Sequence, residues 1–448
     1  MSGIAGIAAA GRRADVDKML AAIGHRGSAG RTVFEVPGAT LGAVWTTAQG
    51  DSAQPEAALV QDYAGEGHFA QAGLADGKLT LRRDPLGVAP LYYGRTDGGA
   101  LCFASEVKAL LGIAREVHEV EPGCSHDGAA AQPYYQLRKQ APLTDPPESV
   151  AGELRRRLEK AVARCIGKQE VGSWLSGGLD SSVITALARA HVQTLHSFAG
   201  GLAGAPDLAY AQEAARFIRS EHHEIVVTLR DMLAALPEVI YHLESFDALL
   251  VRSSLNNYLV AKAAADYVDQ VFSGEGGDEL FAGYDYLAGL PRAELADELI
   301  DITGRLHNTA LQRVDRCASA HGLVAHVVFL DPQVVDYGLR IPPEYKLHEG
   351  VEKWILRRAM TGRLPEGVLA RKKAKFWQGA GVGELLADHA AQQISDGDFS
   401  RQRHLPNGWT LNTKEELMYY RVFRERFPGL EELDWMGRTK GAPVAQAP

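Results

Sequence analysis

Apolar and polar residues alternate along the first third of the chain in short runs that glycine interrupts. Five such runs are TVFEVPG, ATLGAVWTT, GKLTLRRDPLG, APLYYGRT and ALCFASE. A period of two places successive side chains on opposite faces of a strand, and turn residues between the runs favour antiparallel pairing. This part of the sequence therefore predicts packed antiparallel sheets.

The pattern changes near residue 145. The stretch QLRKQAPLTDPPESV is rich in proline and is typical of a linker. The segment that follows, AGELRRRLEKAVARCIG, has apolar residues at helical spacing, namely Leu154, Leu158, Val162 and Ile166. We therefore predict two domains, residues 1–145 and residues 146–448.

Beyond this helix, strand and helix patterns alternate. The strand-like segments are EVGSWLS, TLHSFAGGL, HHEIVVTL and VDQVFSGEGG, and the helix-like segments between them are SSVITALARA, DLAYAQEAARFIRS and RDMLAALPEVIYHL. This alternation is typical of a parallel sheet with crossover helices. The last third is expected to be mainly helical, with a flexible tail at RTKGAPVAQAP.

Composition narrows the class of protein. The 448 residues are 46% hydrophobic and 23% charged, as in an ordinary globular protein of two or three domains. The net charge of −9 argues against nucleic acid or an anionic membrane surface as the main partner. Four widely spaced cysteines indicate neither a disulfide framework nor a zinc site, and no apolar run or leader indicates membrane insertion or export. We expect a cytoplasmic enzyme.

The strongest motif is SWLSGGLDSSVITAL, in which a strand ends at Leu175 and a tight turn leads into a helix. Glycines let a backbone approach a ligand closely, and the free N–H groups at a helix start favour phosphate. Asp180 has the chemistry to hold Mg²⁺ carried by pyrophosphate. The alternative is an incidental Gly-Ser turn. The candidate pyrophosphate loop comprises Ser176, Gly177, Gly178, Asp180, Ser181 and Ser182.

A second motif, VFSGEGGDELFAGYDYL, also lies between a buried strand and a helix. Loops at the carboxyl ends of neighbouring parallel strands converge on one crevice. We therefore expect Asp278 to face the same metal as Asp180, with Glu275 and Glu279 available for amine recognition or acid–base chemistry. Alone, such an acidic loop would as readily be a solvated surface feature.

Further segments occur in a fixed order with these two: MSGIAGI, HRG, RRDPLGVAPLYY, FASEVKAL, LHSFAGGLAGAPD, YHLESFDALLVR, VVFLD, EKWILRRAM and RKKAKFWQGAG. Together they resemble the glutamine-dependent asparagine synthetases, and more broadly the superfamily that includes β-lactam and carbapenam synthetases. The resemblance implies an N-terminal Ntn-hydrolase-like αββα sandwich. It implies, after it, a parallel sheet with helices of the adenine-nucleotide α-hydrolase (PP-loop ATP pyrophosphatase) type. It also implies ATP and Mg²⁺ as cofactors, with a carboxylate converted to an acyl-adenylate that an amine attacks.

The resemblance places nucleotide contacts at Leu175, Ser273 and Gly274, and an adenine-side residue at Gly200. It places magnesium ligands at Asp180 and Asp278.

The same resemblance gives Arg252 a part in adenylate formation and puts Lys373 and Glu275 near the reaction centre. A cation such as Lys373 would stabilise the charge that develops on the reacting carbonyl. The local alternative for Lys373 is a solvated basic run, RKKAK. Its spacing to Phe376 and to the glycines that follow favours the functional interpretation.

The N-terminal end departs from the family. The glutaminase of the family needs cysteine at position 2, and this chain has Ser2, whose hydroxyl is a weaker nucleophile than a thiol. Residues 40–75 contain neither the family's Asn-Gly-Glu-Ile-Tyr-Asn stretch, which supplies an oxyanion hole, nor its glutamine-binding arginine. We therefore predict that glutaminase activity is absent and that Ser2 is a vestige.

The synthetase pocket departs as well. Leu249 and Leu250 replace two threonines, and Val324-Ala325-His326 replaces Glu-Ala-Arg. Lost hydroxyls remove hydrogen-bond partners, and an unpartnered polar group costs about 1–3 kcal/mol. Either the pocket takes an acid other than aspartate, or the leucines face the core.

The sequence thus predicts an AMP- and pyrophosphate-forming carbon–nitrogen ligase that acts on a small carboxylate and on ammonia or a small amine. One alternative is intramolecular amide formation of the β-lactam type. That reaction is less favoured because this chain has Glu275 where those synthetases carry tyrosine, and their partner glutamate has no counterpart near Leu311–Arg316. Another alternative is a non-catalytic regulatory homologue. Packing or homodimerisation is the expected use of the N-terminal domain.

Overall fold

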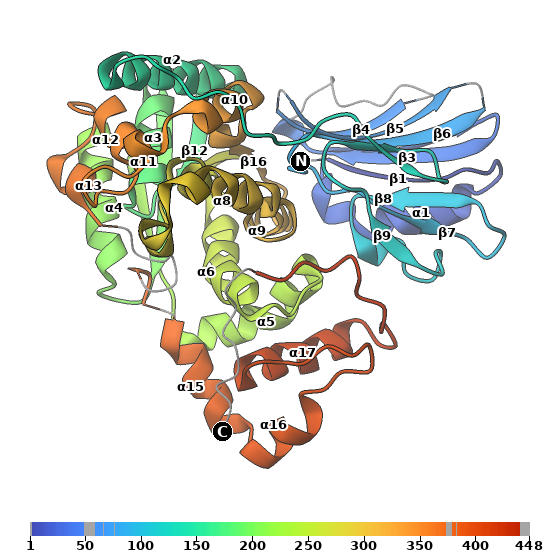
Figure 1. Cartoon of the computed structure of the whole chain (residues 1–448). Helices are drawn as coiled ribbons and strands as arrows, with labels where there is room; N and C mark the ends of the chain where they lie inside the picture. The colour runs from blue at the N-terminus through green and yellow to red at the C-terminus, as the bar shows by residue number, and fades with distance from the viewer. Residues whose placement is uncertain are drawn as a thin grey trace.

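The computed structural model describes residues 2–48, 59–65, 67–75, 77–372, 379–381 and 383–439 (Figure 1). The N-terminal part is built from strands that pair antiparallel. These strands are β1 (Gly3–Ile7), β2 (Gly30–Val36), β3 (Ala39–Trp45), β4 (Leu59–Gly65), β5 (His68–Ala75), β6 (Lys78–Arg83), β7 (Tyr92–Arg95), β8 (Leu101–Ala104), β9 (Val117–Glu119), β10 (Cys124–His126) and β11 (Ala131–Pro133).

Two sheets are stacked in this part. Their strand orders are β2-β3-β1-β8-β7-β9 and β11-β10-β6-β5-β4. Side chains of β6 alternate between buried and exposed, as the period of two predicted. Apolar residues from both sheets, including Ile4, Leu81 and Phe103, fill the space between them. Helix α1 (Arg13–Ala22) packs on the first sheet through Val16, and the predicted sheet-on-sheet arrangement is confirmed.

The C-terminal part contains a parallel sheet with helices around it. Its strands are β12 (Glu170–Trp174), β13 (Thr194–Gly201), β14 (Glu221–Val226), β15 (Gln270–Ser273) and β16 (Val324–Val327). The helices are α2 (Pro147–Cys165), α3 (Leu179–Arg189), α4 (Pro206–Ile218), α5 (Leu229–Leu243), α6 (Ala248–Ala264), α7 (Gly277–Phe281), α8 (Arg292–Gly304), α9 (Ala310–Ser319), α10 (Pro332–Arg340), α11 (Pro343–Lys346), α12 (Trp354–Ala359), α13 (Glu366–Ala370), α15 (Gly383–Gln393), α16 (Asp396–Gln402) and α17 (Lys414–Arg426).

The strand order of the parallel sheet is β14-β13-β12-β15-β16. After β12 the chain adds β13 and β14 on one side, and it then returns to place β15 on the other side of β12. Ligands of open α/β sheets bind at such a reversal, beyond the carboxyl ends of the two strands. The loops that leave β12 and β15 are the two motifs singled out in the sequence.

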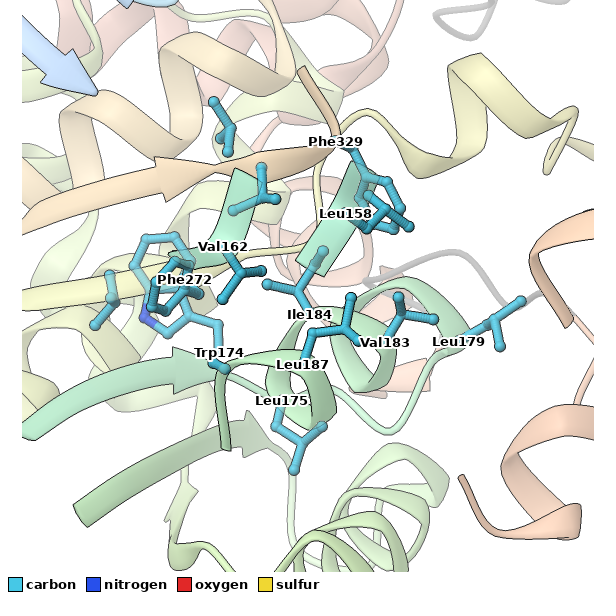
Figure 2. Packing of buried hydrophobic residues seen from close by; sticks show 14 of the residues in the cluster. Leu158, Val162, Trp174, Leu175, Leu179, Val183, Ile184, Leu187, Phe272 and Phe329 are labelled. Atoms are coloured by element: carbon cyan, nitrogen blue, oxygen red, sulfur yellow. The ribbon is translucent and has the colours of Figure 1, made fainter. Parts of the chain in front are cut away.

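Helices α2 and α3 cover this central pair of strands (Figure 2). Leu158 and Val162 of α2 pack with Val183 and Ile184 of α3 and with Phe272 of β15, and all five side chains are buried. Burial of apolar side chains from both helices fixes the start of α3 relative to the sheet. The loop between β12 and α3 therefore has a rigid support.

A separate apolar cluster joins the two parts of the chain. It combines residues of α1 and the first sheet with residues of α5, α6 and α17, among them Val16, Leu236, Leu255 and Phe423. None of the helices within the described ranges has both the length and the apolarity that a membrane crossing requires.

Candidate active site

The loop after β12 closes on itself before α3 begins. Gly177 has a φ of +71°, and a Cβ at this position would lie 2.5 Å from the backbone nitrogen of Ala211, so the loop needs glycine here. Ser181 Oγ accepts a hydrogen bond from Ser176 N at 3.2 Å and donates one to Gly178 O at 3.1 Å. These bonds hold the loop in a narrow turn at the start of α3.

The loop after β15 packs directly against this turn. A Cβ at Gly274 would lie 2.7 Å from Ser181 N, and one at Gly277 would lie 2.6 Å from Asp180 Cγ. Gly276 has a φ of +97°, which also favours glycine. The glycines of the second motif therefore let the two loops touch, and they bring Asp180 close to the start of α7.

Lys353, which precedes α12, connects the two predicted metal ligands. Its ammonium donates to Asp180 Oδ2 and lies 2.6 Å from Asp278 Oδ1. The Lys353 side chain is only 3% exposed, and its backbone is left-handed with a φ of 54°. Gly283 makes room for it, since a Cβ there would lie 2.1 Å from Lys353 Cε. The structure thus brings Asp180 and Asp278 within reach of one cation.

The residues present fit Mg²⁺ bound to the phosphates of a nucleotide. Mg²⁺ in such sites takes one or two protein carboxylates and completes its shell with phosphate oxygens and waters. In the part of the chain that the structure describes, no group of three or more His, Cys, Asp or Glu side chains could hold a metal alone. Ser182 Oγ is buried at the start of α3 and has no hydrogen-bond partner among the described residues, so a donor is available there.

Glu279, beside Asp278 on α7, is a buried carboxyl of this region. Tyr284 donates a hydrogen bond to it. Burial, followed by the charge of Asp278, raises the pKa of Glu279 to about 7. A carboxyl with this pKa can hold or release a proton near neutral pH.

Glu275, in the same loop, forms an ion pair with Arg313 of α9. The side chains of Glu275 and Arg313 are 26% and 13% exposed. Arg313 lies within the stretch Leu311–Arg316, which contains no glutamate that could be the partner. The group that faces Glu275 is a cation.

Arg252 of α6 is bound through both sides of its guanidinium by Glu415 at the start of α17. The distance from Arg252 Nε to Glu415 Oε1 is 3.0 Å. Tyr419 donates to the same carboxylate at 2.6 Å. To bind a phosphate, Arg252 would have to share or exchange this partner.

The remaining predicted nucleotide contacts surround the carboxyl ends of β12, β13 and β15. The side chain of Leu175 lies in the core and its N–H donates to Phe198 O, so its carbonyl oxygen is what it offers to a ligand. Gly200 accepts a hydrogen bond at its carbonyl from Asn256 Nδ2 at 2.8 Å, and a Cβ at Gly200 would lie 2.3 Å from Val260 Cγ2. Ser273 is buried where β15 ends.

Ser2, the residue at the family's nucleophile position, lies just before β1. Ser2 is 2% exposed. Its Oγ donates to Asp62 Oδ1 at 2.9 Å, and its backbone nitrogen donates to the same oxygen at 3.0 Å. The Ser2 hydroxyl is therefore hydrogen-bonded to a carboxylate.

The sequence pattern of the asparagine synthase family matches residues 153–299 and 290–441, and that of a glutamine amidotransferase domain matches residues 51–112. Asparagine synthetase B [glutamine-hydrolyzing] of Escherichia coli is 35% identical over 394 residues, which are 83% of this chain and 71% of that protein. Asparagine synthetase [glutamine-hydrolyzing] 2 of Arabidopsis thaliana is 34% identical over 390 residues, 80% of this chain and 67% of that protein. The chain belongs to the asparagine synthase family.

This asparagine synthase family member is a carbon–nitrogen ligase, and its cofactors are ATP and Mg²⁺. When bound, Mg²⁺·ATP supplies the activation of a carboxylate for amide formation. The two loops at the reversal between β12 and β15, with Asp180 and Asp278, are where the residues fit that group.

The predicted catalytic residue Lys373 of this family member lies outside the described residues. The residues on either side of that segment are described. Arg371 donates to Asp207 and stacks 4.0 Å from the centre of the Tyr210 ring. A Cβ at Gly379 would lie 2.2 Å from the Asp207 carboxylate. Both flanks therefore meet at Asp207, near the start of α4.

The residues that differ from the family's synthetase pocket, Leu249, Leu250 and His326, differ in burial and in the groups that they contact. Leu250 is buried in the apolar cluster of α5, α6 and α17, whereas Leu249 is half-buried and lies outside the apolar clusters of the described residues. His326 is buried in β16, where its ring is hydrogen-bonded to Gln270 at 3.1 Å. Leu250 thus follows the core alternative, whereas Leu249 does not belong to the core. The stretch that lacks the oxyanion-hole motif is residues 40–75, and of these, residues 49–58 and 66 lie outside the described residues.

Three residues that matter to the geometry were missed from the sequence: Lys353, Arg313 and Asp62. Lys353 stands in the segment EKWILRRAM, which carried the resemblance but no assigned role. Arg313 and Asp62 had no signal in the sequence, because each acquires its role only through a contact with a distant residue.

Proposed function

We propose that this ligase forms an amide from a small carboxylic acid and ammonia or a small amine, releases AMP and pyrophosphate, and does not hydrolyse glutamine. Adenylation in residues 146–448, with Asp180 and Asp278 as the magnesium ligands, is the first half of the proposal. Loss of glutaminase activity in residues 1–145 is the second half.

The contact between Ser2 and Asp62 is the observation that carries the second half. Attack on an amide places negative charge on an oxygen, and hydrogen-bond donors about 2.7–3.1 Å away must receive it. The carboxylate of Asp62 accepts the Ser2 hydroxyl bond and adds negative charge at this place. A buried hydroxyl tied in this way lacks both the access and the surroundings of a nucleophile.

The site at the reversal between β12 and β15 supports the first half. The start of α3 offers backbone N–H groups and the Ser182 hydroxyl to phosphate oxygens. Lys353 would balance the charge of the pyrophosphate that leaves, and Glu279 can carry a proton near neutral pH. Lys373 is proposed to stabilise the reacting carbonyl, and Arg252 to assist adenylation.

The pairing of Glu275 with Arg313 disfavours the ring-closing alternative. β-Lactam-type synthetases have a tyrosine and a glutamate at the corresponding places, and this chain has a glutamate and an arginine. An arginine stays protonated and cannot accept the proton of an attacking amine. Retention of both aspartates with a cation between them disfavours a non-catalytic role.

The remaining parts of the proposal concern the protein as a whole. We propose an Ntn-hydrolase-like domain at residues 1–145 and a synthetase domain at residues 146–448. Residues 136–146, between them, contain neither helix nor strand. We further propose that the protein is cytoplasmic and that it forms a homodimer.

An end-point assay by mass spectrometry tests the function. Protein, ATP, Mg²⁺ and aspartate are incubated with ammonium in one reaction and with glutamine in another, and AMP, asparagine and glutamate are quantified. We expect AMP and asparagine with ammonium, and no glutamate from glutamine. Glutamate in the second reaction would refute the loss of glutaminase activity. If no AMP forms with aspartate, a panel of other amino dicarboxylic acids is tested next, and absence of AMP throughout would refute the ligase.

A further inference from the structure

Arg26 is a fully buried arginine that joins the two parts of the chain. Its exposed fraction is 0%. The guanidinium donates to both carboxylate oxygens of Asp315 in α9, at 2.8 and 2.9 Å. It also donates to Ser319 Oγ at 3.3 Å and to Glu106 at 2.9 Å. The bidentate pair with Asp315 fixes both the distance and the orientation of α9 relative to the N-terminal sheets.

The former nucleophile position completes the same network. Arg26 Nε donates to the carbonyl oxygen of Ser2 at 2.7 Å, and a second nitrogen donates to Asp62 Oδ2 at 3.0 Å. The other oxygen of Asp62 is the one that holds Ser2. Ser2 and Asp62 therefore set the orientation of Arg26, which in turn binds α9.

Helix α9 links this network to the synthetase site. Asp315 and Ser319 are four residues apart and lie on one face of the helix, which is the face that Arg26 binds. Arg313 is two residues before Asp315 and projects from a different face, where it pairs with Glu275. A displacement of α9 at Asp315 would move Arg313 with it, because an α-helix is rigid over so short a distance.

We propose that Arg26 and Asp315 are positioning residues for the ligase reaction, and that they act by setting where Arg313 holds Glu275. The inference rests on the proposed function in one respect, which is that Glu275 stands beside the reacting carboxylate. The Ser2 site would then serve the synthesis of the amide by anchoring a helix of the synthetase part. This role needs no bond to be broken at Ser2.

A double-mutant cycle between Asp315 and Arg313 tests the proposal. Asp315→Asn keeps the shape of the side chain and removes the charge that Arg26 binds. Small displacements at a reacting centre cost up to roughly a hundredfold in rate, so we expect kcat for ammonium-dependent AMP formation to fall tenfold or more. The KM for ATP should stay within about twofold, because the hydrogen bonds that hold the phosphate loop join residues of that loop to one another. In an Arg313→Gln background the same substitution should change kcat by less than about threefold.

Two further variants separate positioning from stability. Asp315→Glu restores the charge on a longer side chain, and we expect it to recover thermal stability but not kcat. Ser319→Ala removes only the 3.3 Å contact with Arg26, and it provides a milder variant if Asp315→Asn does not fold. The matched control is Arg83→Gln. Arg83 is also a buried arginine, and the described hydrogen bonds of its side chain are all to residues 87–120.

Additive effects of Asp315 and Arg313 substitutions on kcat would overturn the proposal, as would an equal coupling between Arg83 and Arg313. The wild-type reaction separates this inference from the proposed function. AMP formation by the wild-type enzyme upholds the ligase whatever the cycle shows, and absence of AMP with every acid overturns both.

Discussion

Lys353 Nζ and Asp278 Oδ1 lie 2.6 Å apart, close to where the two glycine-rich loops meet. The same ammonium binds Asp180. One lysine thus lies between the two carboxylates that we propose as magnesium ligands. If Mg²⁺ binds these carboxylates, the ammonium would have to move away from them or share them with the metal.

Replacement of Lys353 by methionine, which has a similar length and no charge, tests that relationship. Removing one preorganised charge from a reacting centre typically costs about 10²–10³ in rate, so we expect a fall of this size in kcat for AMP formation. The half-saturating Mg²⁺ concentration should fall, because the two carboxylates lose their competing cation. Steady-state kinetics over a Mg²⁺ titration measure both quantities. Unchanged kcat with unchanged Mg²⁺ dependence would contradict a role for Lys353.

Asp180→Asn and Asp278→Asn test the metal ligands themselves. Each substitution removes a charged oxygen that Mg²⁺ prefers. We expect pyrophosphate release to be abolished in each variant, as measured by a coupled phosphate assay. Asp297→Asn is the control, since its carboxylate pairs with Lys139 on the surface. Near-normal turnover of Asp180→Asn would remove the metal assignment.

The sequence was sufficient to predict the two loops, because their glycines, serines and aspartates follow buried strands in a strand–helix alternation. It was also sufficient to predict that both loops meet at one edge of a parallel sheet. It could not predict Lys353, which lies 173 residues from Asp180. In the sequence, a lysine that precedes a tryptophan and a short apolar segment cannot be distinguished from a lysine at the start of any other helix. Its role depends on a left-handed backbone and on the space at Gly283, and neither is visible as a pattern.

Substitutions at Ser2 test the loss of glutaminase activity. Ser2→Ala should leave ammonium-dependent turnover within about twofold, because Ser2 binds Arg26 through its backbone carbonyl and not through its hydroxyl. Ser2→Cys should not produce glutamate from glutamine, since Asp62 still stands where donors are needed. Glutamate release is measured by mass spectrometry. A large loss of turnover in Ser2→Ala, or glutamate release by Ser2→Cys, would reinstate position 2 as a nucleophile.

Glu279 predicts a pH dependence of stability. Its ordinary pKa of 4.5 rises to about 7 in the folded protein, so the native state holds a proton that the unfolded chain has lost between these values. Stability contributed by Glu279 is therefore complete below pH 4.5 and declines as the pH rises to about 7. Thermal melts across this range, compared with Glu279→Gln, should show a shallower decline in the variant. Parallel curves would contradict the raised pKa.

His242 predicts the opposite slope at lower pH. Burial, with the charges of His25 and Lys108, lowers the pKa of His242 from 6.5 to about 2, so the native state excludes a proton that the unfolded chain binds. The stability that this neutral ring contributes is present above pH 6.5 and declines as the pH falls below it. In His242→Phe, the melting temperature should depend less on pH between pH 6.5 and 5 than in the wild type. If the pH dependence is unchanged, groups other than His242 cause it.

Leu249 and Leu250 show why a sequence pattern cannot predict which side chains line a pocket. Both are leucines one residue apart on α6, and they are equivalent in the sequence. A helix turns by about 100° per residue, so one of them faces the apolar cluster and the other faces away. Only the direction of the helix relative to its neighbours distinguishes them.

The apolar cluster that runs from α1 to α17 has a consequence for how this protein can change over time. Residues such as Leu236 of α5 and Phe423 of α17 are buried from solvent in one cluster with side chains of the first sheet and of α1. Truncation of the N-terminal part would therefore expose apolar side chains of α5, α6 and α17 to water, so this part cannot be lost without a cost in stability. We expect the two parts to unfold together in one cooperative step. A chimera that takes one part from a relative should be less stable than either parent, because the side chains that meet in this cluster would come from different sequences.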